Sequence, residues 1–373
     1  MQIFSPSIAK ANYNFDSLMV PFRAVASDIY KKKSVIFKSG DLGTAIRASM
    51  TFPFYFRPIM VDSIPLFDGG IFNNFPWDVM VEEFNPDFII GSNVSQNPSR
   101  PDELSVILQL ENMIVTKTDF DIPDSLGVTI NTRVDNISLL QFTDVEGVAN
   151  YGYLKTIEKM DTIKQLLARR TNFAELSQKR KDFVYNQLDL NFCSIKVKGL
   201  KESQAKYAYN IFKNKKNTTE YYDFEKKYFK IIADKYIDRI YPNALFNKEK
   251  NAFDLTLDAS LKPDLNIHLG GNISSSSLNQ GFFGIDYRFL QKYATFFSAN
   301  TYFGRFYSSA KFVVRQDYSL PLPFFLQLGG YFNRYDYYGG NTDPFFEDYK
   351  PPYLINKDSF FEAQSGFPVS SSS

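Results

Sequence analysis

The chain has 373 residues and a formal net charge of only +1, from 42 Lys and Arg against 41 Asp and Glu, and this balance argues against nucleic acid as a partner. The length suggests two or three domains, and the single cysteine, Cys193, excludes a disulfide framework and a multi-cysteine zinc site. His268 is the single histidine, so a mechanism that needs a catalytic histidine would depend on it, and we expect neither a metal nor a cofactor.

The sequence shows neither a membrane-spanning helix nor a secretory signal, but its aromatic residues are unevenly distributed. No apolar run reaches 18 residues, so no spanning helix is expected. Met1 is followed by neither a basic segment nor a long apolar one, and no secretory signal is visible. Phe and Tyr are concentrated in residues 263–373.

Residues 1–185 alternate short apolar runs with helical patterns, which predicts an α/β domain with a mostly parallel sheet. The helix that begins after Asp41 has that residue as its N-cap, and another helix has a proline at its first position. The predicted strands are 20–26, 64–67 and 88–94, and the predicted helices are 41–50, 76–84 and 145–168.

Residues 190–262 have the pattern of a small, separate α+β domain. A strand over 192–197 is followed by helices over 202–212 and 223–237 and by a strand over 252–257.

From residue 263 onward the period of the pattern changes to two. Runs of about ten residues, such as 306–318, alternate apolar side chains with polar ones such as Lys311 and Arg315. Aromatic-rich strands of this length are typical of a transmembrane β-barrel, whereas the strands of the alternative, a soluble β-sandwich, are shorter. We count five or six such strands, and the smallest membrane barrels need about eight. The prediction for 263–373 is therefore the first strands of an incomplete antiparallel barrel.

The chemistry is concentrated in Asp68, which ends a predicted strand and precedes Gly69 and Gly70. An aspartate at the carboxyl end of a parallel strand can be a general base for a hydroxyl nucleophile, and the two glycines permit positive φ or close approach. The alternative is an aspartate that only stabilises a tight turn.

Four blocks then resemble the second half of the patatin-like phospholipase catalytic domain, in that family's order. They are VPFRAVASDI (20–29), GDLGTAIRASMTFPFYF (40–56), LFDGGIFNNFPWDVM (66–80) and FIIGSNVS (88–95). The resemblance implies that residues 1–185 are the C-terminal part of a three-layer α/β domain. It also implies that Asp68 is the catalytic proton acceptor of a Ser-Asp dyad that uses no histidine.

The nucleophile of that dyad is missing from the sequence. The family carries a glycine-rich oxyanion loop and a Gly-x-Ser-x-Gly elbow upstream of these blocks, and the chain contains no Gly-x-Ser-x-Gly. We therefore expect an internal fragment that is inactive alone, although the family that it resembles consists of serine lipid acyl hydrolases.

The neighbours of Asp68 have structural alternatives to a catalytic role. Asn73 and Asn74 are expected to orient the turn and cap the next helix. Phe75 and Trp77 either line an acyl pocket or pack between helix and sheet. His268 is expected in an alternating strand and not as a ligand.

The downstream zones are similar to those of patatin-like proteins of Bacteroidetes and other Gram-negative bacteria. By that resemblance, 190–262 is a POTRA-like domain and 263–373 anchors the protein in the outer membrane, with membrane lipids as substrate. The alternative is a non-enzymatic outer-membrane assembly or transport protein with a degenerate hydrolase half. A third possibility is a soluble α/β binding protein with a β-rich tail. Headgroup and acyl-chain preference and the oligomeric state stay open.

Overall fold

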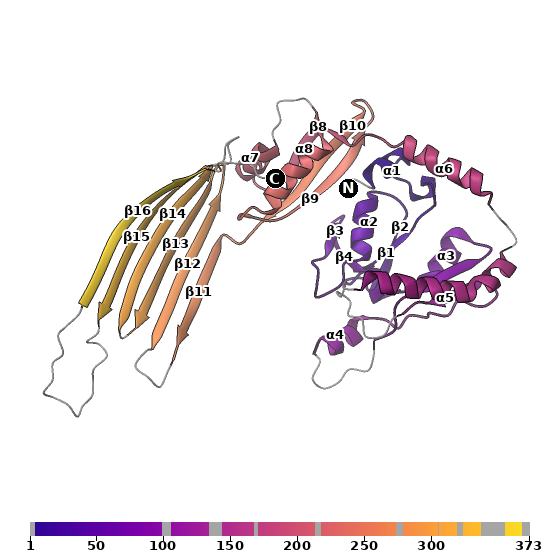
Figure 1. Cartoon of the computed structure of the whole chain (residues 1–373), viewed down its shortest axis with the longest axis horizontal. Helices are drawn as coiled ribbons and strands as arrows, with labels where there is room; N and C mark the ends of the chain where they lie inside the picture. Colours follow the sequence, from indigo (N-terminus) through magenta and orange to yellow (C-terminus); the bar gives the residue numbers. More distant parts are fainter. Residues whose placement is uncertain are drawn as a thin grey trace. The chain divides into compact units, whose positions relative to one another are not determined.

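The computed structural model describes residues 4–98, 106–133, 144–167, 171–212, 218–273, 279–304, 306–318, 324–336 and 355–367. The chain divides into two compact units, Met1–Asp189 and Leu190–Ser373, which are described separately. Figure 1 shows their helices and strands in the colours of the sequence. The predicted division into 1–185, 190–262 and 263–373 stays a prediction.

The first sheet of unit 1 has the order β2-β1-β4-β3 (Figure 1). Its strands are β1 (Ala24–Asp28), β2 (Lys33–Phe37), β3 (Ile59–Val61) and β4 (Ile64–Asp68). All three neighbouring pairs are antiparallel, so the expectation of a mostly parallel sheet is wrong for these strands. The reason for the β1–β2 and β3–β4 pairs is the length of the connections: residues 29–32 and 62–63 form hairpins, and a parallel crossover needs about a dozen residues or more.

The helical elements in this part of unit 1 begin at points that the sequence marks well. They are α1 (Ser5–Lys10), the 3₁₀ turn η1 (Phe15–Ser17), α2 (Leu42–Ser49) and α3 (Trp77–Phe84). The predicted cap of α2 is confirmed, because Asp41 accepts a hydrogen bond from the Thr44 N–H. Strand β1 begins at Ala24, later than predicted, because Pro21 has no N–H and the Phe22 N–H donates to the Phe15 carbonyl outside the sheet. Ile8, Phe15 and Ala45 are central to the core beneath α1 and α2.

A parallel pair of strands completes unit 1. Strands β5 (Ile89–Asn93) and β6 (Gly127–Asn131) run side by side in the same direction. The remaining helices are α4 (Val106–Ile114), α5 (Val145–Leu166) and α6 (Phe173–Tyr185). Among the described helices, none combines the length and the apolar character that crossing a bilayer requires.

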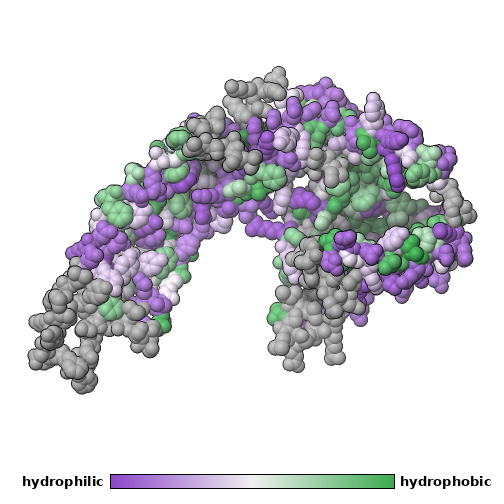
Figure 2. Space-filling model, viewed as in Figure 1, coloured by the Kyte–Doolittle hydropathy of each residue, from purple (hydrophilic) through white to green (hydrophobic). Residues whose placement is uncertain are grey.

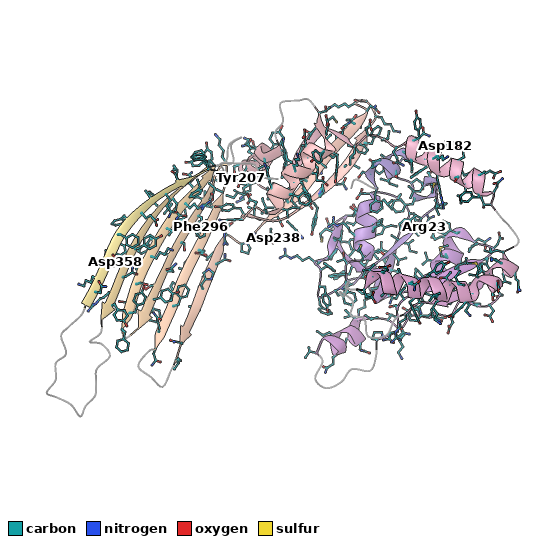
Figure 3. All side chains as sticks on the ribbon, viewed as in Figure 1. Arg23, Asp182, Tyr207, Asp238, Phe296 and Asp358 are labelled. Carbon is teal, nitrogen blue, oxygen red and sulfur yellow. The ribbon has the colours of Figure 1, made fainter. Side chains whose placement is uncertain are left out.

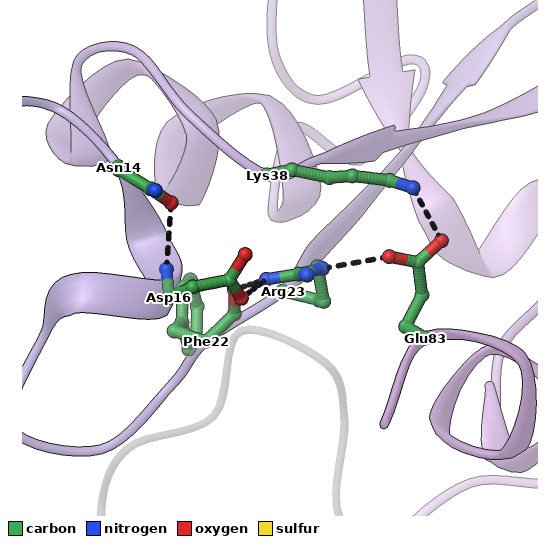
Figure 4. Close-up of polar contacts among 6 residues, drawn as sticks. All are labelled: Asn14, Asp16, Phe22, Arg23, Lys38 and Glu83. Atoms are coloured by element: carbon green, nitrogen blue, oxygen red, sulfur yellow. Dashed lines mark hydrogen bonds and ion pairs between the residues drawn. The ribbon is translucent and has the colours of Figure 1, made fainter. Parts of the chain in front are cut away.

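Arg23 joins the start of β1 to α3 through a partly buried cluster of charges (Figures 3 and 4). Its guanidinium lies 2.7 Å from an Asp16 carboxylate oxygen and 3.0 Å from Glu83 Oε2, and its side chain is 8% exposed. Lys38 Nζ lies 2.6 Å from the other Glu83 oxygen. The guanidinium also packs over the Phe84 ring, 4.7 Å from its centroid. The two cations, Lys38 first and then Arg23, hold the pKa of Glu83 below its usual value.

We expect Glu83→Gln to destabilise unit 1 at neutral pH only. A carboxyl whose pKa is lowered by folding stabilises the fold above its unfolded-state pKa, and this stabilisation is lost as the pH falls through its folded-state pKa. Urea unfolding followed by the fluorescence of Trp77, the single tryptophan, should therefore give a lower midpoint for the variant at pH 7. The gap should close below about pH 3. Glu82→Gln, on the exposed side of α3, is the control, and a gap that persists in acid would contradict the electrostatic explanation.

Unit 2 begins with a mixed sheet in the order β8-β7-β10-β9. Its elements are β7 (Asn191–Lys198), α7 (Glu202–Phe212), β8 (Thr219–Glu220), α8 (Tyr221–Ile232), β9 (Ile237–Asn247) and β10 (Ala252–Leu261). Strand β7 is parallel to β10, and β9 is antiparallel to it. The prediction of a helix as far as Ile237 is wrong, because the Asp234 side chain accepts from the Tyr236 N–H and turns the chain after Ile232.

An aromatic cluster forms the core between this sheet and its helices. Phe224 on α8 is 2% exposed, and its ring centroid lies 5.1 Å from that of Phe192 on β7 and 5.5 Å from those of Phe212 and Tyr228. Phe253, Leu255 and Leu257 on β10 are fully buried from the sheet side. Cys193, next to Phe192, is a partly buried free thiol.

The second sheet of unit 2 has six antiparallel strands in chain order, which agrees with the predicted count (Figure 1). They are β11 (Leu265–Asn272), β12 (Gln280–Leu290), β13 (Ala294–Gly304), β14 (Tyr307–Tyr318), β15 (Phe324–Asp336) and β16 (Ile355–Gly366). Pairing is continuous along each neighbouring pair, and strand lengths of 8 to 13 residues agree with the long runs in the sequence.

The register of these strands sorts their side chains onto one apolar and one polar face. Val314 pairs with Phe297 on one side and Leu328 on the other, so apolar positions line up across the sheet. On this face, fourteen large apolar side chains are between 37% and 82% exposed: Leu265, Ile267, Leu269, Phe283, Tyr287, Phe289, Phe297, Phe303, Phe312, Val314, Leu326, Leu328, Phe332 and Phe361. Hydrophobic patches reach the surface over these strands in Figure 2.

Charged and amide side chains occupy the opposite face. His268 Nε2 lies 3.1 Å from Asp286 Oδ2, and Lys311 and Arg315 extend over the Tyr331 and Phe325 rings at 5.0 and 3.8 Å. The predicted alternation is therefore confirmed for the described strands, and His268 lies in a strand as expected.

Hydrogen bonds tie the α/β part of unit 2 to the end of the six-stranded sheet. The Tyr207 hydroxyl (Figure 3) donates to Asp234 Oδ2 at 2.8 Å, and the Tyr236 hydroxyl donates to Asp317 Oδ2 on β14 at 2.9 Å. Arg315 donates to the other oxygen of Asp317 at 2.7 and 2.9 Å. Burial, followed by the neighbouring carboxylates, raises the pKa of both phenols, so both remain protonated donors.

Candidate active site

Asp68 is the last residue of β4 and the N-cap of the 3₁₀ turn η2 (Gly69–Ile71). Its Oδ1 accepts a hydrogen bond from the Gly70 N–H at 2.8 Å, and its own N–H donates to the Thr51 carbonyl at 2.9 Å. Among the described residues, Gly70 provides the one donor to this carboxylate. The strand end is therefore fixed from both sides, while the carboxylate keeps acceptor capacity for a proton.

The environment makes the Asp68 carboxylate a better base than an ordinary aspartate. Burial raises its pKa, and the Gly70 N–H opposes that rise only in part. The predicted position at the end of a strand is correct, but β4 is antiparallel to both of its neighbours. The rule for ligand sites in parallel sheets therefore does not explain this position.

Close approach requires the two glycines after Asp68. A Cβ on Gly69 would lie 2.4 Å from the Val25 carbonyl oxygen, and one on Gly70 would lie 2.6 Å from Asn74 Oδ1. In the described ranges, positive φ occurs among glycines at Gly40 and Gly199 and not here. Of the two reasons expected for Gly69 and Gly70, the positive φ is thus wrong and the close approach is confirmed.

Asn73 and Asn74 orient the turn as expected, but the prediction that they cap the next helix is wrong, because the N-cap of α3 is Pro76 and receives no side-chain hydrogen bond. Asn73 Nδ2 donates to Asp78 Oδ1 at 2.7 Å, which links the turn to the first turn of α3. Asn74 Nδ2 donates to Ser95 Oγ at 2.7 Å, and the Asn74 N–H donates to Thr118 Oγ1 at 3.1 Å. The turn after Asp68 is thereby tied to the segments that follow β5 and α4.

Phe75 and Trp77 pack as structural residues. Phe75 is buried with Ile89 and Ile122, and Trp77 packs against this cluster. Of the two interpretations offered by the sequence, the contacts favour packing between α3 and the β5–β6 pair.

Thr51 and Ser27 support the site without having been predicted from the sequence. Thr51 is buried, and its hydroxyl donates to the Arg47 carbonyl at 2.6 Å while its carbonyl accepts from Asp68. Ser27 is fully buried on β1, and its hydroxyl donates to the Gly69 carbonyl at 3.4 Å. At both positions the sequence has a polar residue among apolar ones, and this pattern could have indicated a buried hydrogen-bonding role.

No set of three or more metal-ligating side chains occurs among the described residues. The expectation of no metal and no cofactor stays a prediction.

The comparisons with known proteins bear on this part of unit 1. The family model described as patatin-like phospholipase matches residues 9–81, which include Asp68, Gly69 and Gly70. This segment is similar to patatin-like phospholipases. Proteins named as uncharacterized NTE family proteins, from Mycobacterium bovis and Mycobacterium tuberculosis, are 35% identical to the chain over 112 residues. The matched part is 29% of this chain, and the chain spans 31% of the length of each relative.

Two solved structures resemble the chain more weakly. BamA from Haemophilus ducreyi lacking POTRA domains 1–3 has a TM-score of 0.38 at 11% identity, over 48% of this chain and 33% of that one. CdiB from Acinetobacter baumannii has a TM-score of 0.35 at 10% identity, over 63% of this chain and 49% of that one. At such scores neither similarity supports a conclusion about this protein.

We expect Asp68→Asn to stabilise unit 1 slightly at neutral pH. Because folding raises the pKa of this carboxyl, its contribution to stability is complete below its unfolded-state pKa and is lost as the pH rises through its folded-state pKa. Asparagine keeps an Oδ1 acceptor for Gly70 without the buried charge. The urea midpoint, read by Trp77 fluorescence, should be higher for the variant at pH 7 and equal below about pH 4. Asp62→Asn, at the exposed β3–β4 turn, is the control, and a lower midpoint at every pH would contradict this expectation.

Proposed function

We propose that the chain is part of a lipid acyl hydrolase in which Asp68 is the general base of a Ser-Asp dyad. The observation that carries the proposal is the match of residues 9–81 to the patatin-like phospholipase family, with a carboxylate of raised pKa fixed at the end of β4 inside the matched segment. The nucleophilic serine would come from outside these 373 residues.

The reaction needs one proton acceptor and no histidine. Asp68 takes the proton of the serine hydroxyl as the serine oxygen attacks the ester carbonyl carbon, and it returns that proton to the leaving alcohol as the ester bond breaks. Water then attacks the acyl-serine, Asp68 takes a proton from that water and gives it back to the serine oxygen, and the free fatty acid leaves. The partly buried position strengthens Asp68 as a base for both steps.

Residues 263–373 are proposed to be strands of an outer-membrane barrel, with 190–262 as a POTRA-like domain. Support comes from the exposed apolar face of β11–β16, opposite a face that carries most of the described charged side chains of these strands. On this proposal the apolar face contacts acyl chains, the protein is held in the outer membrane of a Gram-negative bacterium, and its substrates are membrane lipids.

The test uses the protein translated from the complete reading frame that contains these residues. Hydrolysis of phospholipid acyl esters is expected, and Asp68→Asn should lower kcat by about 10²–10⁴-fold. Asp62→Asn should leave kcat unchanged, and the 373-residue chain alone should show no turnover. A reading frame without a serine elbow, together with no hydrolysis by its protein, would favour the non-enzymatic assembly or transport protein instead. An Asp68→Asn protein of full activity would contradict the role of Asp68 as the general base.

A further inference from the structure

The connection between α2 and β3, residues 50–58, exposes a group of large apolar side chains beside Asp68. We refer to it as the aromatic loop. The exposed side chains are Met50 (63%), Phe54 (58%), Tyr55 (49%) and Phe56 (53%). The loop is joined directly to the site, because the Thr51 carbonyl in it accepts the Asp68 N–H at 2.9 Å.

The aromatic loop is an ordered turn whose tip faces outward. Pro53 is buried beneath it, the Phe56 N–H donates to the Phe52 carbonyl at 3.1 Å, and the Phe52 and Tyr55 rings lie 5.6 Å apart. Phe54 has φ of +68°, a conformation that is unfavourable for a bulky side chain. A backbone held in such a conformation, with its aromatic side chain exposed, is a feature of functional sites more than of packing.

The strand register places the tip and the carboxylate at the same edge of the sheet. Asp68 pairs with Ala26, and Ile59, the first residue of β3, pairs with Leu66. The chain therefore enters β3 at the edge where β4 ends. The two hairpin turns, 29–32 and 62–63, lie at the other edge.

The charge around the aromatic loop suits an anionic surface. Residues 42–61 contain Arg47 and Arg57 and no acidic residue, and Arg57 is exposed next to Phe56. Arginine binds phosphate groups, and Phe and Tyr are favoured where acyl chains meet headgroups. The two chemistries together match the surface of a lipid bilayer and not a purely apolar or purely polar partner.

We propose that the aromatic loop inserts into the interfacial layer of a bilayer that carries anionic headgroups, and so sets the Asp68 carboxylate against its lipid substrate. This proposal rests on the proposed function, because it names the lipid surface that would supply the ester substrate to Asp68. The apolar face of β11–β16 is a separate surface in unit 2, so lipid contact must be measured at the loop itself.

The experiment places one tryptophan at the loop tip. In the full chain with Trp77→Phe, Phe56→Trp reports on the aromatic loop and Tyr185→Trp, on the exposed end of α6, is the matched control. Each protein is reconstituted into vesicles of phosphatidylcholine and phosphatidylglycerol with brominated acyl chains, which quench tryptophan on contact. Emission from Phe56→Trp should fall about twofold and shift to shorter wavelength, with little change for Tyr185→Trp. Without phosphatidylglycerol the quenching should weaken.

Equal quenching of the two variants would overturn the proposal. Emission that is blue-shifted without lipid and depends on protein concentration would also overturn it, by showing that a second copy covers the loop. If Trp77→Phe does not give the circular dichroism spectrum of the parent chain, the same comparison is made by subtracting the parent emission with Trp77 retained. The quenching experiment does not require the protein to hydrolyse lipid. Its failure can therefore be distinguished from a failure of Asp68→Asn to lower kcat.

Discussion

Replacing Gly69 with alanine is expected to lower the free energy of unfolding of unit 1 by about 3 kcal/mol. The new Cβ would lie 2.4 Å from the carbonyl oxygen and 2.8 Å from the carbonyl carbon of Val25. Both are backbone atoms of β1, paired with β4 and β2 at neighbouring positions, so neither can move without breaking the sheet. Urea unfolding followed by Trp77 fluorescence measures the loss.

Gly152→Ala is the matched control for that substitution. Gly152 lies in α5, and a Cβ there would meet Thr132 Cγ2 at 3.8 Å, an ordinary contact. Alanine favours the helix by about 1 kcal/mol relative to glycine, so this variant should be as stable as the parent chain or slightly more so. Equal midpoints for Gly69→Ala and the parent chain would show that β1 and β4 are not held as closely as the structure indicates.

Phe224→Ala is expected to destabilise the α/β part of unit 2 by about 3–5 kcal/mol. The side chain is 2% exposed and contacts three other rings, from β7, α7 and α8. Its removal leaves a cavity between sheet and helices that these rigid neighbours cannot fill. Hydrogen exchange of peptides from β7 and β10 should accelerate by about 10²–10³-fold or more, because opening becomes easier by that free energy.

Phe229→Ala controls for the loss of an aromatic residue from the same helix. Phe229 is 63% exposed, so its truncation should change exchange rates in β7 and β10 by less than about threefold. Similar acceleration in both variants would contradict the role of Phe224 in the core, because the effect would not depend on the burial of the removed ring.

Local sequence signals predicted much of unit 1. The Asp41 cap and the proline at the start of α3 fixed two helices to within a residue or two of their observed ends. Asp68 was singled out at a strand end before two glycines, but this pattern also fits a simple turn, and the catalytic role was predicted from the resemblance to patatin-like phospholipases. Antiparallel pairing escaped prediction, because pairing direction depends on how the chain returns and not on the composition of a strand. The hairpins at 29–32 and 62–63 account for the β1–β2 and β3–β4 pairs, whereas the long-range pairing of β1 with β4, which sets the order β2-β1-β4-β3, has no local signal.

In unit 2 the period-two alternation predicted β14 and β15 and the faces of their side chains. It failed for β9, where Pro242 interrupts the pattern and the preceding helix has strong helical periodicity as far as Ile232. Proline is tolerated there because β9 is an edge strand, paired with β10 alone among the described strands. Contacts such as Thr51 with Asp68 join positions that no local pattern connects.

The hydrogen bonds of Tyr236 have a mechanical consequence. Without them, a pull on β14 passes across β13, β12 and β11 and then along the backbone from β11 to β10. With them, Asp317 transmits the load sideways to Tyr236, and the Tyr236 carbonyl, which accepts the Lys262 N–H at 3.0 Å, passes it to the chain just before β11. These hydrogen bonds form a second connection, beside the backbone, between the end of the sheet and the α/β part of unit 2. A strand that shifts along its own axis must therefore carry the turn after α8 with it.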